Sequence, residues 1–476
     1  MQPHPVAGDG VRSDAGSFRD PHSRVFYANG EVYRALSGQA LTDWEALTAS
    51  GLLDARLPVG EVVATEPTEM NAADFGQLLP QGAAAVLRHE RIPFISYPYE
   101  WSFEMLRDAA RLQLELLLAA LERGLILKDA TPYNVQWRGS RPVFVDIGSF
   151  EPYVNGQPWA GYRQFCMLYL YPLMLRAYRD VPFHPLLRGS LDGISPSDFD
   201  HLLPRWTRLR RGVLKHVYLH AKLERRYAAA GGEVRTELKR AGFGAELIKA
   251  NVTSLLRLVE RLKWKPGETP WAQYGTINEY GPADVEAKRR FVETAAASRK
   301  WQLAWDLGCN DGSYSKIAAA HADATVAVDG AENLIDDIYR ERREAGAGNI
   351  LPLVVDLADP SPSLGWRGRE RSSLEGRAKP DLVLCLALVH HLAITKSIPP
   401  ESFLEWLRSL DASVVIEFVT LDDPMGKLLA SRKPGGVHPG YDKEPFQQSL
   451  QKLFEIQARE EICEGRRILY FVRPRV

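Results

Sequence analysis

A short apolar segment that runs directly into a glycine-containing turn constrains the fold of this 476-residue chain more than any other feature. Residues 303–307 are apolar except for Asp306, Gly308 and Gly312 bracket the turn, and residues 313–320 have the pattern of a helix. Glycine lets the backbone approach a ligand closely, because it has no side chain, and the start of a helix offers free N–H groups. A strand, a glycine turn and a helix in succession therefore predict a Rossmann-like α/β domain with a ligand at the turn.

Acidic residues end the next two predicted strands. Residues 324–329 form an apolar run that ends on Asp329, 17 positions after Gly312, and residues 350–355 lead to Asp356. A carboxylate at the end of the second strand can accept hydrogen bonds from both hydroxyls of a ribose. The side chain of Asp356 can reach the exocyclic amine of an adenine. The two acids thus indicate a ligand that contains a nucleoside.

Two further apolar stretches, residues 380–392 and 413–419, read as strands that are buried on both faces, as in a parallel sheet. Residues 454–458 and 467–472 read as an antiparallel pair. The predicted fold class is therefore α/β, with a mostly parallel, seven-stranded sheet that ends in an antiparallel hairpin.

This series resembles the class I S-adenosylmethionine-dependent methyltransferases over residues 298–476. The first motif of that family is commonly D-x-G-x-G-x-G, and here an asparagine takes the place of the middle glycine. Asparagine tolerates left-handed backbone angles better than most residues, so the departure is mild. The resemblance implies S-adenosyl-L-methionine as the cofactor, and it implies six cofactor-binding residues: Asp306, Gly308, Asn310, Gly312, Asp329 and Asp356. The gross pattern also resembles bacterial methyltransferases linked to nodulation and natural-product pathways, which does not fix a substrate.

A nicotinamide dinucleotide is the alternative ligand for such a turn. Dinucleotide sites use G-x-G-x-x-G to cradle a pyrophosphate. Here the turn reads G-C-N-D-G, so that Asp311 stands where the anionic pyrophosphate would lie. S-adenosylmethionine has no phosphate and carries a sulfonium cation, which suits an acidic turn. The sequence therefore favours the methyl donor.

His390 and His391 follow the fourth predicted strand and are the candidate catalytic residues. Ligands bind beyond the carboxyl ends of the strands in an open α/β sheet. A neutral imidazole there could take a proton from a hydroxyl or amine as it attacks the methyl group. Alternatively, one imidazole packs under the loop and binds backbone, and methyl transfer relies on proximity and orientation alone.

The N-terminal half carries a second constellation of polar residues. Asp129 is followed by Asn134 five residues later and by Asp146 in an Asp-Ile-Gly triplet. This spacing resembles the catalytic loop and metal-binding turn of the protein kinase-like fold, H-R-D-x-x-x-x-N and D-F-G. The resemblance implies that Asp129 orients a hydroxyl nucleophile and that Asn134 and Asp146 hold magnesium.

Departures from the kinase pattern predict a degenerate lobe rather than an active kinase. Leu127 and Lys128 stand where His and Arg usually do, and no lysine precedes Lys128, so the phosphate-binding strand lysine is absent unless Arg34 replaces it. Arginine and lysine are not interchangeable at such sites. We therefore expect a lobe that binds a nucleotide, a substrate or the methyltransferase half. The alternative treats Asp129 and Asp146 as turn acids that cap local backbone.

The middle of the chain is rich in bases and aromatic residues. Residues 204–226 read as a solvated helix face or, alternatively, as a contact for RNA or an acidic carrier. The bases are Arg205, Arg208, Arg210, Arg211, Lys215, Lys222, Arg225 and Arg226. His216 and His220 share a helix face, but a metal would need a third ligand, so no metal is expected. Residues 264–280 contain Trp264, Trp271, Tyr274 and Tyr280, which either touch substrate or pack between domains.

Composition and length complete the expectations. The net charge of −1 excludes general electrostatic binding of nucleic acid, and four dispersed cysteines favour a reducing cytoplasm. No apolar run is long enough to span a bilayer, so we expect no membrane association. The predicted division is a disordered tail (residues 1–20), a kinase-like α+β domain (21–230), a helical linker or cap (231–297) and the methyltransferase domain (298–476).

The predicted activity is methyl transfer to an unidentified acceptor. A small molecule or biosynthetic intermediate is the favoured acceptor. RNA or protein, docked on the basic middle helix, is the first alternative. The second alternative is a ligand-sensing protein with a non-catalytic kinase-like lobe.

Overall fold

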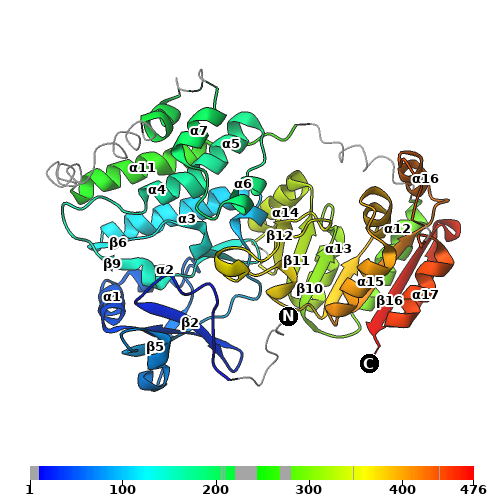
Figure 1. Ribbon diagram of the computed structural model, residues 1–476, viewed down its shortest axis with the longest axis horizontal. Helices are drawn as coiled ribbons and strands as arrows, with labels where there is room; N and C mark the ends of the chain where they lie inside the picture. The colour runs from blue at the N-terminus through cyan, green and yellow to red at the C-terminus, as the bar shows by residue number, and fades with distance from the viewer. Residues whose placement is uncertain are drawn as a thin grey trace. The chain divides into compact units, whose positions relative to one another are not determined.

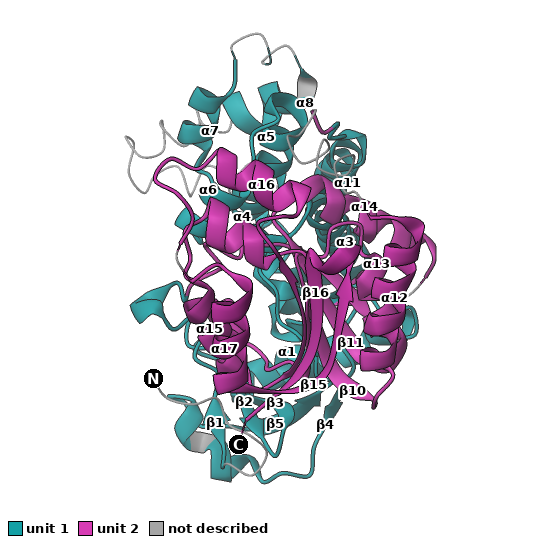
Figure 2. Cartoon of the chain, turned by 90° about the vertical axis from the view of Figure 1, so that its right-hand side faces the viewer, with its two compact units in different colours: residues 1–137, 142–265, 363–371 teal, residues 138–141, 266–362, 372–476 magenta. Residues whose placement is uncertain are grey.

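The computed structural model describes residues 10–204, 207, 210–219, 244–267, 280–346, 348–438 and 440–475. The chain divides into two compact units (Figure 2). Unit 1 comprises Met1–Trp137, Pro142–Lys265 and Ser363–Arg371, and unit 2 comprises Arg138–Arg141, Pro266–Pro362 and Ser372–Val476. Each unit therefore includes a short stretch from the other half of the sequence. None of the helices in the described part of the chain is long and apolar enough to cross a membrane.

Unit 2 is built on a seven-stranded sheet with the strand order β12-β11-β10-β13-β14-β16-β15 (Figure 1). The strands are β10 (Trp301–Leu307), β11 (Ala322–Asp329), β12 (Ile350–Val354), β13 (Leu382–Cys385), β14 (Ser413–Val419), β15 (Phe454–Ile462) and β16 (Arg467–Pro474). The first five strands in that order pair in parallel, whereas β16 pairs antiparallel with both β14 and β15. The predicted parallel sheet with a terminal hairpin is confirmed.

Burial explains why the central strands read as unbroken apolar runs. Every residue of β13 and of β14 is buried, because helices cover the sheet on both faces, as a parallel sheet requires. These helices are α12 (Pro282–Ala296), α13 (Ser313–His321), α14 (Glu332–Glu344), α15 (Pro400–Ser409), α16 (Pro424–Ser431) and α17 (Lys443–Leu453). One core cluster joins Phe291 of α12 to Trp301 of β10 and Leu469 of β16. Helix α12 is thus an integral layer of unit 2.

The register of the parallel strands gathers the predicted site residues at one edge. Asp306 pairs with Ala327 on the neighbouring strand, and Asp329 pairs with Val354. The carboxyl ends of β10, β11 and β12 therefore lie side by side, with the glycine turn following the first of them. This edge is where an open α/β sheet binds its ligand.

Unit 1 begins with a five-stranded antiparallel sheet of order β1-β2-β3-β5-β4. The strands are β1 (Arg12–Ser13), β2 (Ser23–Ala28), β3 (Glu31–Leu36), β4 (Thr65–Pro67) and β5 (Ala85–His89), and helix α1 (Gly38–Ala49) follows β3. The long helix α3 (Phe103–Leu121) starts at the N-cap Ser102, whose hydroxyl accepts from the amide of Met105. Most of its residues are buried, which makes α3 the central helix of this unit.

Short paired strands follow α3. Strand β6 (Leu125–Leu127) pairs antiparallel with β9 (Phe150–Pro152), and between them lies a hairpin of β7 (Val135–Arg138) and β8 (Arg141–Phe144). Helical segments complete the unit: α2 (Leu52–Arg56), α4 (Tyr162–Phe165), η5 (Cys166–Leu170), α5 (Tyr171–Arg179), α6 (His184–Gly189), α7 (Pro196–Leu202), α8 (Arg211–Val213), η7 (Leu214–Tyr218) and α11 (Ala245–Arg261). The apolar residues of η5 and of the first part of α5 are buried.

The expected tail over residues 1–20 is folded from residue 10 onward. Strand β1 pairs with β2, and the guanidinium of Arg19 donates twice to the buried carboxylate of Glu370, at 2.7 and 2.9 Å. These contacts order residues 10–20, although the composition of this segment alone suggests disorder. Several predictions lie outside the described residues: those for residues 1–9 and for Arg205, Arg208, His220, Lys222, Arg225, Arg226, Trp271 and Tyr274.

Candidate functional site

The turn after β10 places three residues in the left-handed region of backbone space. The φ angles are 75° at Gly308, 50° at Asn310 and 73° at Gly312. Glycine adopts this region freely, and asparagine does so more readily than other residues with side chains. Asn310 therefore adopts a left-handed backbone conformation at the position of the usual middle glycine. A Cβ at position 312 would lie 3.1 Å from the side chain of Ile338, so the turn is also tightly packed.

Asp306 is buried in the strand that leads to this turn. Its carboxyl accepts a hydrogen bond of 2.6 Å from the hydroxyl of Ser315 on α13. Burial raises the pKa of Asp306 to about 7, against which the Ser315 bond acts as a smaller opposing effect. This contact ties the first turn of α13 to β10 and holds the intervening turn in shape.

Asp329 closes the turn from the neighbouring strand. Its two carboxylate oxygens accept hydrogen bonds from the backbone amides of Asn310, at 3.0 Å, and Ala331, at 2.9 Å. Burial raises the pKa of Asp329, and the backbone hydrogen bonds oppose that shift. The structure thus brings together the glycine turn and the predicted ribose-binding acid, which are linked by a direct hydrogen bond.

Asp356 lies two residues beyond the end of β12, the third strand at the same edge. One oxygen accepts from the amide of Ala358 and the other from the ammonium of Lys396, each at 2.9 Å. Both side chains of the ion pair are about half exposed. Exposed ion pairs contribute little stability, so Lys396 holds this carboxylate only weakly.

His390 and His391 follow β13 with their rings 4.2 Å apart. His390 is 2% exposed, and its Nδ1 atom has no hydrogen-bond partner among the described residues. Burial, then His391 and Arg467, lower the pKa of His390 well below its usual value. Burial and Arg467 lower the pKa of His391 to about 4. Both imidazoles are therefore neutral at neutral pH, which makes them hydrogen-bond acceptors but weak bases.

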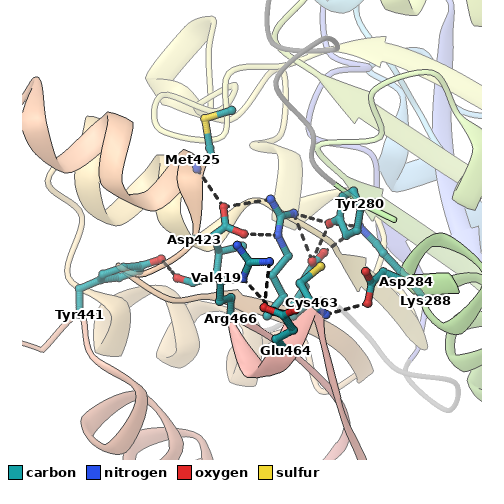
Figure 3. A network of polar contacts seen from close by, with 12 residues as sticks. Tyr280, Asp284, Lys288, Val419, Asp423, Met425, Tyr441, Cys463, Glu464 and Arg466 are labelled. Carbon is teal, nitrogen blue, oxygen red and sulfur yellow. Dashed lines mark hydrogen bonds and ion pairs between the residues drawn. The ribbon is translucent and has the colours of Figure 1, made fainter. Parts of the chain in front are cut away.

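A buried network of polar side chains near the end of β14 was not predicted from the sequence (Figure 3). The ammonium of Lys288 on α12 lies 2.7 Å from the carboxylate of Glu417, and the hydroxyl of Tyr280 donates to the same carboxylate at 2.7 Å. The guanidinium of Arg467 forms two hydrogen bonds to Asp423, at 2.7 and 3.1 Å, and also contacts Tyr280. The network joins α12, β14 and β16.

Charge balance makes this buried network tolerable. Two cations face two carboxylates, and Glu417 is fully buried. Burial alone would raise the pKa of Glu417, but Lys288 and then Arg467 outweigh it and hold that pKa below its usual value. A signal existed in the sequence: Glu417 is the single charge in the strand Ser-Val-Val-Ile-Glu-Phe-Val, and a buried charge needs a partner. The partners are 129 and 50 positions away in the chain, which no local pattern reveals.

In unit 1 the structure brings Asn134 and Asp146 together. The amide of Asn134 donates to one oxygen of Asp146 at 3.3 Å, and the guanidinium of Arg34 on β3 lies 2.9 Å from the other oxygen. Arg34 also donates to the hydroxyl of Ser23 at 3.1 Å. Burial and then Asp146 raise the pKa of Asp129. The sequence had singled out Arg34 only as a replacement for a missing lysine, and the structure places it on the predicted metal ligand.

These residues fit a magnesium ion poorly. Asp146 already has the positive charge of Arg34 at ion-pair distance, where a metal would otherwise compensate it. Within the described part of the chain, no three His, Cys, Asp or Glu side chains are arranged to hold a metal. His216, the described member of the middle histidine pair, instead contacts the hydroxyl of Tyr162 through Nδ1 at 2.8 Å.

Comparison with known proteins finds one full-length similarity. The chain is 32% identical over 462 residues to the nodulation protein NoeA of Rhizobium meliloti (strain 1021), which covers 96% of this chain and 95% of that protein. No protein-family model matches the chain.

Similarity to solved structures is confined to part of the chain. The N-methyltransferase NodS from Bradyrhizobium japonicum WM9, in complex with S-adenosyl-L-homocysteine, matches with a TM-score of 0.31 and 12% identity, over 44% of this chain and 94% of NodS. The magnesium protoporphyrin IX methyltransferase ChlM from Synechocystis PCC 6803 matches with a TM-score of 0.28 and 19% identity, over 44% of this chain and 90% of ChlM. At scores this low, the fold assignment of unit 2 depends on its strand order and register alone.

Proposed function

The chain belongs to the family of the nodulation protein NoeA, and from this premise we propose that it transfers a methyl group from S-adenosylmethionine to a small-molecule acceptor. The observation that carries the proposal is the clamp at the carboxyl edge of unit 2. The carboxylate of Asp329 holds the left-handed turn of Gly308, Asn310 and Gly312 through the amide of Asn310. This arrangement presents backbone and carboxylate to a ligand without offering a cradle for phosphate.

The chemistry of this edge suits the methyl donor. Asp329 ends β11 and Asp356 follows the end of the adjacent strand β12, so these two carboxylates make the edge acidic and favour a cationic ligand with a ribose and an amine. Asp329 would hold the ribose, Asp356 would accept from the adenine amine, and the turn would line the methionine side. When bound, the cofactor supplies an electrophilic methyl group on its sulfonium. We propose this site in preference to a dinucleotide site because Asp311 would repel a pyrophosphate.

The acceptor would be positioned by the residues after β13. His390 and His391 are neutral at neutral pH, and the Nδ1 atom of His390, which has no partner among the described residues, can accept a hydrogen bond from an acceptor N–H or O–H. Their low basicity makes them poor proton acceptors in the ground state. We therefore infer that they orient the acceptor, and that transfer proceeds mainly through proximity and alignment.

Titration calorimetry with S-adenosylmethionine tests the donor site directly. Asp329→Ala removes both the proposed ribose contact and the bond that closes the turn, so the affinity should fall by about ten-fold or more. Asp323→Ala is the matched control: it removes a carboxylate from the other end of the same strand, where Asp323 pairs with the exposed Lys300. Absence of donor binding by the intact protein, or equal binding by both variants, would reject the proposal.

Two other functions remain alternatives under this proposal. A methyltransferase acting on RNA or protein would need the basic middle segment as a docking surface, and half of that segment lies outside the described residues. A ligand-sensing protein would bind the methyl donor without ever methylating an acceptor. Transfer of a radioactive methyl group to extracted small molecules, and not to RNA or protein, would support the favoured acceptor class. Because the relative is named as a nodulation protein, small molecules of nodulation are the first acceptors to test. We propose that the protein acts in the cytoplasm.

For unit 1 we propose a kinase-like fold without phosphoryl transfer. The support is an antiparallel sheet with a helix after its third strand, then a long buried helix, a loop from Asp129 to Asn134, a hairpin and Asp146. The contact of Asn134 with Asp146 adds to this support. Against catalysis stand the missing lysine and the ion pair of Arg34 with Asp146. Absence of ATP turnover in magnesium, with the Asp146→Ala variant as the blank, is the expected result.

A further inference from the structure

Unit 1 contains a basic hollow that includes none of the described site residues. Its cavity volume is about 600 Å³. The C-terminal turn of α5, the segment that follows α11, and Pro204 line it: Arg176, Ala177, Tyr178, Arg179, Asp180, Pro204, Lys263, Trp264 and Lys265. This volume is in the range of pockets that take small organic ligands. Four of the lining side chains are cations and one is a carboxylate.

Three of the lining residues, Arg176, Asp180 and Trp264, are held together by contacts with one another. The guanidinium of Arg176 is mostly buried, lies 4.1 Å from the centre of the Trp264 ring, and pairs with Asp180 at 3.1 Å. The indole N–H of Trp264 donates to the same carboxylate at 2.7 Å. Asp180, the single acid that lines the hollow, thus already binds Arg176 and Trp264. It also fastens the segment after α11 to the end of α5.

The other three cations of the hollow are not paired with a carboxylate of the described residues. Arg179, Lys263 and Lys265 are exposed, and no anionic group in the described part of the chain lies within ion-pair distance of them. Both α5 and α11 end at the hollow, and the ends of helices attract cations through about half a negative charge each. Two such partial charges amount to about one unit, which is less than the charge of the three cations that lack an anionic partner among the described residues and are here called uncompensated. Complementing the helix ends therefore does not account for the excess positive charge.

We propose that this hollow binds a small organic molecule through a phosphate or diphosphate group. A multiply charged anion matches three uncompensated cations in a small space better than a single carboxylate does. The guanidinium of Arg179 can donate two parallel hydrogen bonds to phosphate oxygens, and the ammonium groups of Lys263 and Lys265 add point charges. The volume that remains beside Trp264 and Tyr178 accommodates the organic part of the ligand. The residues of this site belong to unit 1, whereas those of the proposed methyl-donor edge belong to unit 2.

Calorimetric titration of the full-length protein with inorganic pyrophosphate tests the site. The double variant Lys263→Gln, Lys265→Gln should raise the dissociation constant at least about ten-fold, because it removes two of the three uncompensated charges. Lys300→Gln with Lys427→Gln is the matched control, since both lysines are exposed members of unit 2 and the change in net charge is the same. The control should stay within about two-fold of the wild type, and binding should weaken as salt is raised.

The two double variants give outcomes that distinguish a specific anion site from a general effect of net charge. A ten-fold loss confined to the Lys263 and Lys265 variant supports it. An equal loss in both double variants would mean that only net charge matters, and no pyrophosphate binding by the wild type at millimolar concentration would mean that the site is absent. Binding of a single-stranded RNA oligomer without binding of pyrophosphate would also overturn it in favour of a nucleic-acid surface. Titration of the same variants with S-adenosylmethionine should give unchanged affinity, which keeps this test independent of the donor site.

Discussion

At the scale of single residues, the left-handed turn after β10 and its hydrogen bond to Asp329 follow from local sequence, whereas the buried network around Glu417 does not. Gly308, Asn310, Gly312 and Asp329 are linked by local geometry: an apolar strand, a required left-handed turn and a second strand of similar length. Local patterns of this kind are visible in one sequence. The partners of Glu417 come from α12 and β16, and only the packing of the whole unit places them beside it.

Arg34 provides a prediction at this scale. Its guanidinium compensates Asp146, so we expect the wild-type protein to bind no Mn²⁺ at that carboxylate, as measured by the loss of the free Mn²⁺ signal in electron paramagnetic resonance. Arg34→Met should unmask the carboxylate and the nearby Asn134, and create a weak site that Asp146→Asn abolishes. Arg56→Ala, which frees Glu61 from a comparable pair at 2.7 Å, is the control and should gain no such site. Asp146-dependent Mn²⁺ binding by the wild type would contradict this account.

At the scale of elements, the sequence predicts type and order better than partners. The central strands of unit 2 were predictable because burial on both faces leaves long apolar runs, and β16 has a similar run, whereas β15 is mostly polar and exposed. The pairing of β1 with β2 was not, because β1 has only two residues and both are exposed. The basic hollow was not predicted either, since its walls come from segments that are more than 80 positions apart.

The network between α12, β14 and β16 gives a prediction for these elements. Glu417→Gln keeps the shape of the side chain but removes the carboxylate that pairs with Lys288 and leaves Arg467 with Asp423, and removing one member of a buried ion pair costs about 3–5 kcal/mol. We expect the free energy of unfolding of unit 2, measured by urea denaturation, to fall by that amount. Glu460→Gln is the control, because Glu460 pairs with the largely exposed Arg290 at 3.4 Å and should contribute about 0–1 kcal/mol. Equal effects of the two substitutions would show that the network does not stabilise the unit.

At the scale of the whole molecule, the two units are not consecutive in the sequence. The segment Ser363–Arg371 lies between β12 and β13 in the chain but belongs to unit 1, where Glu370 binds Arg19 and Arg371 lies 4.2 Å from the centre of the Tyr133 ring. The segment Arg138–Arg141 belongs to unit 2, where the hydroxyl of Ser140 donates to the carbonyl of Ile350. The predicted boundaries at residues 230 and 298 treat the halves as separate. Interleaving of this kind depends on contacts across more than 200 positions, which local pattern does not encode.

This interleaving predicts how the protein responds to a cut between its halves. A protease recognition site inserted between residues 270 and 279 would sever the chain but leave each unit with all of its segments, because Ser363–Arg371 and Arg138–Arg141 remain folded into units on the other side of the cut. We therefore expect the two fragments to elute together in size-exclusion chromatography and to separate only in denaturant. Substituting Glu370→Gln and Ser140→Ala removes hydrogen bonds of both exchanged segments and should promote separation of the cut fragments, whereas Asp323→Ala should not. Immediate separation of the cut wild-type fragments would mean that the exchanged segments contribute little to holding the chain together.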